Sequence, residues 1–117
     1  LVVFGKEKML DFTFIDDCVR GIISAVEKFD VAKNNVINLS GAEPVKILEV
    51  AEEIKKQIGS SSNISLDNNR PGEVVKYTAD LTKAKELLDY QPQTSVVQGI
   101  THAIKWHHEV TVSAPVA

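Results

Sequence analysis

Residues 35–59 read NVINLSGAEPVKILEVAEEIKKQIG, and this stretch decides the fold class. A short apolar run at 35–39 is followed by Gly41, a pattern typical of a β-strand that ends in a turn. Pro44 then restrains the chain before a segment whose apolar residues recur at helical spacing, namely Ile47, Ala51, Ile54 and Ile58. Gly59 suits the position that ends such a helix. The stretch therefore predicts a strand, a turn and an amphipathic helix within a mixed α/β fold.

Shorter apolar segments on both sides complete the predicted order of elements. Strands are expected where β-branched, aromatic and other apolar residues cluster, at 1–4, 12–15, 64–66 and 75–78. Helices are expected where apolar residues recur at helical spacing, at 17–29, from Asp80 through Leu88, and from Thr94 or Ser95 through His107. Residues 111–117 show no periodicity. We therefore expect one domain over residues 1–110 and a disordered tail at 111–117.

Composition excludes several classes of function. The chain has 117 residues, of which 44% are hydrophobic and 25% charged, as in an ordinary globular domain with one core. No apolar run approaches the roughly 20 residues that span a bilayer, so no membrane partner is expected. A net charge of −3 provides no basic surface for nucleic acid. Cys18 is the single cysteine and no secretion leader is recognisable, so we expect a reducing cytoplasm.

Few residues indicate chemistry on their own. The sequence has neither a G-x-x-G-x-x-G turn nor a Tyr-x-x-x-Lys pair, which dinucleotide binding and proton transfer would use. His102, His107 and His108 are poorly spaced for one helix face, which favours a solvated surface over a metal site. Asp16 and Asp17 directly precede a helical pattern, so we expect helix capping rather than acid–base catalysis.

The stretch Arg70-Pro71-Gly72-Glu73 gives the strongest indication of a ligand. A guanidinium beside a glycine-containing turn can hold a phosphate group with two parallel hydrogen bonds. The same residues also suit an ordinary surface turn, and local chemistry alone favours that second interpretation.

Five segments, taken together, carry a resemblance: Asp11-Phe12-Thr13-Phe14-Ile15-Asp16-Asp17, Asn38-Leu39-Ser40-Gly41, Arg70-Pro71-Gly72-Glu73, Thr78-Ala79-Asp80 with Lys83-Ala84, and Leu88-Asp89-Tyr90-Gln91-Pro92. Each is weak alone, but their order and spacing over residues 1–109 are specific. The chain resembles the extended short-chain dehydrogenase/reductase family, in the UDP-glucose 4-epimerase-like branch of NAD-dependent epimerases and dehydratases.

The resemblance implies a fold and a role. In this family an N-terminal Rossmann domain carries NAD and the catalytic residues, and the C-terminal part contacts the nucleoside diphosphate of the sugar. The chain resembles only the C-terminal part. We therefore expect the edge of the parallel sheet plus a small α+β substrate-binding domain, with no catalytic, cofactor-binding or metal-binding residue. NAD is expected in the full-length parent enzyme, whereas the isolated fragment is expected to bind no cofactor and to catalyse nothing.

The resemblance also implies substrate-binding residues. Val2 and Phe4 would lie along the nucleobase, and Tyr77 would form a wall of the sugar-nucleotide pocket. Arg70 would hold the diphosphate, and Glu73 would reach the ribose hydroxyls. The expected partners are a nucleoside-diphosphate sugar and the missing N-terminal half. Because the helix at 17–29 would expose its apolar face in a fragment, self-association is also expected.

Two residues depart from the family pattern and leave alternatives open. Leu10 stands where the pattern has an arginine that contacts the diphosphate, and Glu73 stands where aspartate is more common. Leu10 favours a second interpretation, a fragment of an extended short-chain reductase that acts on a non-nucleotide substrate. A third interpretation is a non-catalytic interaction module.

Overall fold

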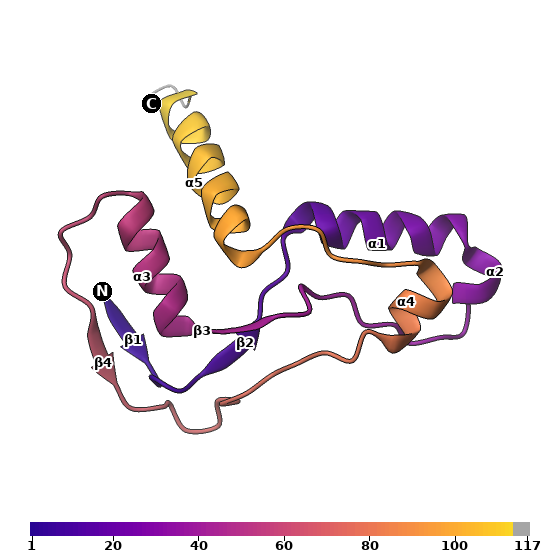
Figure 1. The fold of residues 1–117 in the computed structure, drawn as a ribbon, viewed down its shortest axis with the longest axis horizontal. Helices are drawn as coiled ribbons and strands as arrows, with labels where there is room; N and C mark the ends of the chain where they lie inside the picture. The colour runs from indigo at the N-terminus through magenta and orange to yellow at the C-terminus, as the bar shows by residue number, and fades with distance from the viewer. Residues whose placement is uncertain (114–117) are drawn as a thin grey trace.

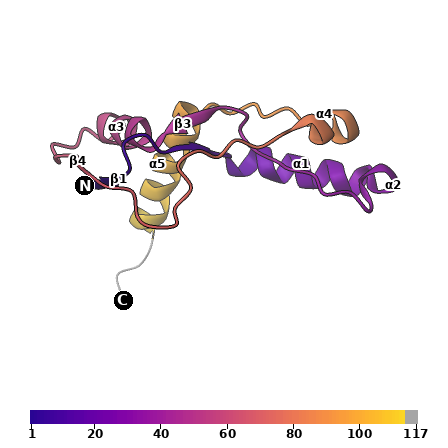
Figure 2. The same cartoon turned by 90° about the horizontal axis from the view of Figure 1, so that it is seen from below.

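The computed structural model describes residues 1–113 as short strands and helices in a thin layer (Figure 1, Figure 2). The strands are β1 (Val2–Phe4), β2 (Met9–Asp11), β3 (Pro44–Lys46) and β4 (Ser65–Asp67). The helices are α1 (Ile15–Glu27), α2 (Phe29–Ala32), α3 (Ile47–Gln57), α4 (Thr82–Leu88) and α5 (Val96–Ser113). The predicted mixed α/β fold is confirmed, with strands and helices alternating along most of the chain.

The strands form two separate pairs. β1 and β4 run parallel, with Val3 opposite Leu66, whereas β2 and β3 run antiparallel, with Leu10 opposite Val45. The predicted extended segment at 75–78 lies beside β2, because the Tyr77 N–H donates to the Met9 carbonyl oxygen at 3.0 Å. These contacts bring residues 1–11 against three later segments of the chain, at 44–46, 65–67 and 75–78.

Two helix ends follow the sequence signals. After α3, Gly59 adopts a φ of 62°, a left-handed conformation that favours glycine. The Ser60 and Gly59 N–H groups then donate to the Lys55 and Lys56 carbonyl oxygens at 3.0 and 3.2 Å, the hydrogen-bond pattern of a Schellman motif. At the start of α5, the Ser95 Oγ accepts from the Gln98 N–H at 3.3 Å, and the Gln98 side chain accepts from the Ser95 N–H at 3.0 Å. Ser95 therefore caps α5, and the helix begins at Val96, next to the predicted start at Thr94 or Ser95.

The predicted strand at 12–15 is wrong. Helix α1 already begins at Ile15, and the strand that precedes it is β2, which ends at Asp11, before the predicted segment. Phe12 and Phe14 instead line a cavity against α5, and the Phe14 ring lies 5.4 Å from the His102 ring. The two aromatic side chains pack beside α5, and their segment pairs with no strand among the described residues.

Capping of α1 by Asp16 or Asp17 is also wrong. The residue before α1 is Phe14, which makes no side-chain capping bond. Asp17 is fully buried and accepts hydrogen bonds from the N–H groups of Gln93 and Thr94, at 2.9 and 3.0 Å, while it pairs with Arg20. Burial alone would raise the pKa of Asp17, but these N–H donors and the Arg20 charge bring that pKa below its ordinary value. The ionised Asp17 carboxylate therefore holds residues 93–94 against α1 by hydrogen bonds.

Residues 35–39 form no strand, contrary to the prediction. Among residues 1–113 no strand lies beside this segment to complete a ladder of hydrogen bonds. Its apolar side chains Ile37 and Leu39 pack instead against the buried cluster of Leu81, Ala84, Leu88 and Tyr90 around α4. The expected tail is wrong at its start as well, because α5 includes residues 111–113, while 114–117 lie outside the described residues.

The layer is extended for its length. Its radius of gyration is 17.2 Å, whereas a compact domain of this size has about 13 Å. The apolar face predicted for the first helix is open in the single chain, from Val19 at 42% exposed to Val26 at 70%. Figure 2 shows α1 along one side of the layer, with no other helix packed over its outer side. Within the described part of the chain, no helix combines the length and apolarity needed to cross a membrane.

Candidate functional site

A cavity of about 440 Å³ lies between β1, α3 and the turn at 70–73. Four of the five predicted substrate-binding residues line it, namely Val2, Phe4, Arg70 and Glu73. The two sequence segments that supply them are brought together by the parallel pairing of β1 with β4, after which the chain continues into the turn. The structure therefore places residues about seventy positions apart around one space.

One wall of the cavity is apolar. Helix α3 presents Ile47, Val50 and Ile54 to it, residues that share one helix face at i, i+3 and i+7. Strand β1 contributes Val2, Val3 and Phe4 to the same wall, and Val3 is only 4% exposed. This wall can take a flat or apolar group of a ligand.

Arg70 supplies a cation at the rim. Its guanidinium lies over the Phe4 ring, 4.0 Å from the centroid, a cation–π contact that covers one planar face. The turn behind it is closed by a hydrogen bond from the Glu73 N–H to the Arg70 carbonyl oxygen at 3.2 Å, with Gly72 at a φ of 82°. Among the described residues no acceptor takes a hydrogen bond from the guanidinium. Its N–H donors therefore have no acceptor among the described residues and are available to an anion.

Lys8 is a lining residue that the sequence reasoning missed. Its Nζ lies 3.1 Å from Glu73 Oε2, and the two side chains are only 15% and 30% exposed. Glu73 thus already holds one partner inside the chain, in addition to the ribose role expected for it. The available signal was a basic residue two positions before Leu10, in the turn between β1 and β2.

Tyr77 is not brought together with the other four residues. It is 53% exposed and does not line the cavity, and its backbone pairs with Met9 of β2. The wall role expected for Tyr77 stays a prediction.

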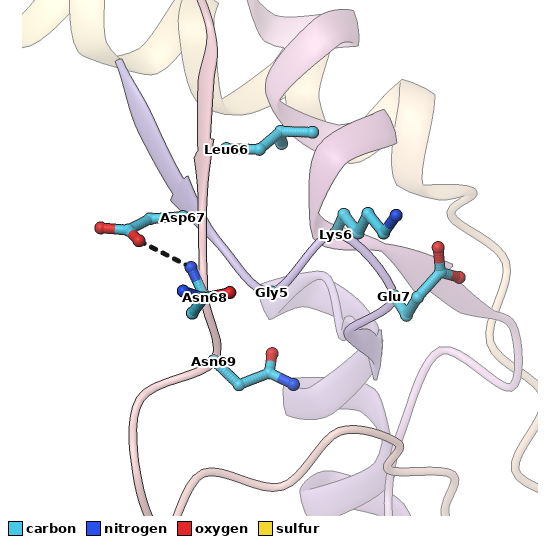
Figure 3. A pocket seen from close by; sticks show the side chains of 7 residues that line it. All are labelled: Gly5, Lys6, Glu7, Leu66, Asp67, Asn68 and Asn69. Atoms are coloured by element: carbon cyan, nitrogen blue, oxygen red, sulfur yellow. Dashed lines mark hydrogen bonds between the residues drawn. The ribbon is translucent and has the colours of Figure 1, made fainter.

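A second cavity, of about 510 Å³, lies where the parallel strands β1 and β4 end (Figure 3). It is lined by Gly5, Lys6, Glu7, Leu66, Asp67, Asn68 and Asn69. In Figure 3 the Lys6 and Glu7 side chains extend to one side of the strands and Asp67 to the other. Glu7 also pairs with Lys46 at 3.0 Å. These charges do not converge on one ligand position, so the cavity beside α3 is the better candidate site.

The described residues do not fit a dinucleotide cradle. Such a cradle needs a strand, a glycine-rich turn and a helix whose N-terminus faces the pyrophosphate. β1 does end at a glycine, Gly5, with a φ of 78°, but the chain then turns into β2 rather than into a helix. Within residues 1–111, no three His, Cys, Asp or Glu side chains are grouped so that they could hold a metal ion.

Comparison with known proteins finds relatives that are named as sugar-nucleotide epimerases or dehydratases. Residues 1–103 match the family described as GDP-mannose 4,6 dehydratase. The chain is 35% identical over 107 residues to a Bacillus subtilis protein named as an uncharacterized UDP-glucose epimerase, covering 91% of this chain and 34% of that protein. It is 32% identical over 109 residues to the UDP-glucuronate 4-epimerase of Thermodesulfobacterium geofontis, covering 92% and 33%. The chain thus spans about a third of the length of these relatives, and corresponds to their C-terminal part.

Solved structures show the same relationship. The UDP-glucuronic acid 4-epimerase of Bacillus cereus, in complex with UDP-glucuronic acid and NAD, matches with a TM-score of 0.84 and 33% identity, over 94% of this chain and 35% of that one. An epimerase from Methanothermobacter thermautotrophicus matches with a TM-score of 0.87 and 26% identity, over 93% and 33%. The arrangement of strands and helices described above is therefore that of a part of these larger enzymes.

Proposed function

The chain belongs to the GDP-mannose 4,6 dehydratase family, among the NAD-dependent epimerases and dehydratases, and on that premise we propose that it binds the nucleoside diphosphate of a sugar nucleotide. In this proposal the chain is the substrate-binding portion of an enzyme whose NAD-binding portion lies outside these residues. A cytoplasmic location belongs to the same proposal, because the single Cys18 can form no intrachain disulfide.

The observation that carries the proposal is the convergence of Val2, Phe4, Arg70 and Glu73 on one cavity. The apolar wall formed by β1 and α3 suits the flat face of a nucleobase. The free donors of Arg70 suit phosphate oxygens, for which a planar guanidinium gives two parallel hydrogen bonds. The Glu73 carboxylate can accept hydrogen bonds from ribose hydroxyls. The chemistry of the cavity thus changes from apolar to cationic, as a nucleoside diphosphate requires.

Calorimetric titration of the chain with UDP, GDP and uridine tests this function. We expect a nucleoside diphosphate to bind and uridine, which has the base and ribose but no phosphate, to bind much more weakly. Equal binding of uridine and UDP would indicate that the cavity holds no phosphate. Failure of every nucleotide to bind would favour a reductase with a non-nucleotide substrate or a non-catalytic module.

The proposal gives no catalytic role to this chain. NAD supplies hydride transfer in enzymes that bind it, and the described residues offer no turn that would hold its pyrophosphate. We therefore expect no NAD binding in the same calorimeter and no turnover of UDP-glucose. Stoichiometric NAD binding at micromolar affinity, which corresponds to about 8 kcal/mol, would contradict this assignment.

The exposed face of α1 is proposed to be covered by a second copy when the chain is alone. Val19, Ile22, Ile23 and Val26 are between 42% and 70% exposed. Monomers seldom leave an apolar patch of more than a few hundred Å² open to water. In a protein as long as the relatives, the NAD-binding portion is the proposed occupant of the same face.

A further inference from the structure

We propose that Lys8 provides the second cation for the phosphate groups of the ligand, an inference that rests on the proposed function. Leu10 stands where the family pattern has an arginine, so that position offers no charge to a diphosphate. Lys8 lines the same cavity as Arg70 from a different segment of the chain.

The charge of the cavity requires a second cation. Arg70 and Lys8 together oppose the single carboxylate of Glu73, which leaves one net positive charge among these three lining residues. Without Lys8, Arg70 and Glu73 would cancel, and the cavity would offer a diphosphate no net attraction. Because the Lys8 side chain is only 15% exposed, its charge is less screened by water than that of a surface lysine.

The backbone fixes the position of Lys8. Its N–H donates to the Gly5 carbonyl oxygen at 3.0 Å, which closes the turn after β1. Its carbonyl oxygen accepts from the Ile47 N–H at 3.0 Å, at the first residue of α3. Lys8 is thus tied to the two elements that form the apolar wall. The ammonium group has three donors, of which Glu73 takes one, so donors remain for a ligand.

Glu73 positions the ammonium group. The ion pair at 3.1 Å holds the flexible lysine side chain at the cavity, which lowers the conformational entropy that binding would otherwise cost. In this arrangement Glu73 lies beside both proposed phosphate-binding cations, because it pairs with Lys8 and lies on the same turn as Arg70.

The experiment compares Lys8→Met with a matched control, Lys46→Met. Lys46 also forms an ion pair with a glutamate, Glu7, at 3.0 Å, but it does not line the cavity. Calorimetric titrations with UDP and with uridine are made at two ionic strengths. We expect Lys8→Met to weaken UDP binding about tenfold, to leave uridine binding unchanged, and to reduce the salt dependence of UDP binding. Lys46→Met should match the wild type, and Lys8→Arg should recover most of the affinity.

An NMR measurement on the wild-type chain tests the same contact without relying on a variant that could fail to fold. The side-chain carbon resonance next to Lys8 Nζ should shift when UDP is added and stay in place when uridine is added. If UDP binds but neither this resonance nor the affinity of Lys8→Met changes, the Lys8 assignment is overturned and the proposed function stands. If the wild type binds no nucleoside diphosphate, both are overturned.

Discussion

Replacing Arg70 with alanine tests whether Arg70 binds the ligand or only stabilises the turn at 70–73. The guanidinium contacts Phe4 at the rim and takes part in no side-chain hydrogen bond within the described residues, so its loss removes about 0.5–1 kcal/mol of cation–π stabilisation. A charge-assisted hydrogen bond to phosphate contributes about 1.5–3 kcal/mol, and each 1.4 kcal/mol is about tenfold in affinity. Arg70→Ala should therefore weaken UDP binding by about one to two powers of ten and lower stability only slightly.

The assay is calorimetry with UDP at fixed ionic strength, combined with a melting curve for each variant. Arg70→Lys should recover part of the affinity, because an ammonium keeps the charge but loses the planar fork. Lys33→Ala, which removes a cation paired with Asp30 on α2, serves as the control and should bind UDP normally. Normal UDP binding by Arg70→Ala would place the diphosphate elsewhere. Early melting of both Arg70 variants would show that the residue is structural.

Three further predictions concern stability and association. Asp17→Asn should lower the free energy of unfolding by about 3 kcal/mol in urea titrations, whereas the exposed Asp16→Asn should change it little. The pKa of Asp17 is lowered in the folded chain, so its carboxylate stabilises the fold fully above the ordinary pKa of 3.8, and this stabilisation is lost as the pH falls below that value. Asp17→Asn should not show this loss of stability. Gly41→Ala should cost at least about 2 kcal/mol in the same titration, since its Cβ would overlap a backbone carbonyl oxygen; wild-type stability would contradict that packing. Ile22→Lys should shift the chain toward monomer in sedimentation, while Val110→Lys on α5 should not, and a monomeric wild type would refute self-association through α1.

The fold was predictable where a signal is local. The helical spacing around Ala51 and the glycine at position 59 depend on residues within a few positions, and both predictions were confirmed. The start of α5 was predicted at Thr94 or Ser95, and the helix begins beside them at Val96. The strands at 12–15 and 35–39 were wrong because strand formation depends on a distant partner. Phe12 packs toward α5 and Leu39 toward α4, and no local pattern distinguishes such packing from a buried strand.

Asp17 shows the same limit in a polar residue. Its position directly before a helical pattern favours a cap, but its partners are the N–H groups of Gln93 and Thr94, about seventy-six residues later. A carboxylate near a helix start can satisfy donors of that helix or donors from another segment, and the sequence does not specify which.

For the candidate site, the resemblance predicted residues that the structure brings together, and it could not supply their internal partners. Arg70 and Glu73 were chosen from a motif, whereas Lys8 becomes visible only when the parallel pairing of β1 with β4 places residues 1–8 beside the turn. Leu10 of β2 indicated the absence of a charge, and the proposed compensating charge belongs to Lys8, two residues earlier in the turn before β2.

The parallel pairing of β1 with β4 also has a consequence for the time course of folding. Val2 lies opposite Ser65, and the Ser24 hydroxyl donates to the Leu88 carbonyl oxygen, so both closures join residues more than sixty positions apart. Long loops must close before either contact contributes energy, which makes such topologies slow to form. Helix α3, whose own backbone hydrogen bonds are local, can form early, whereas the cavity that it borders is completed only when the first and the later segments have met. Nucleotide added during refolding should therefore leave the early helical signal unchanged and bind only in the last kinetic phase.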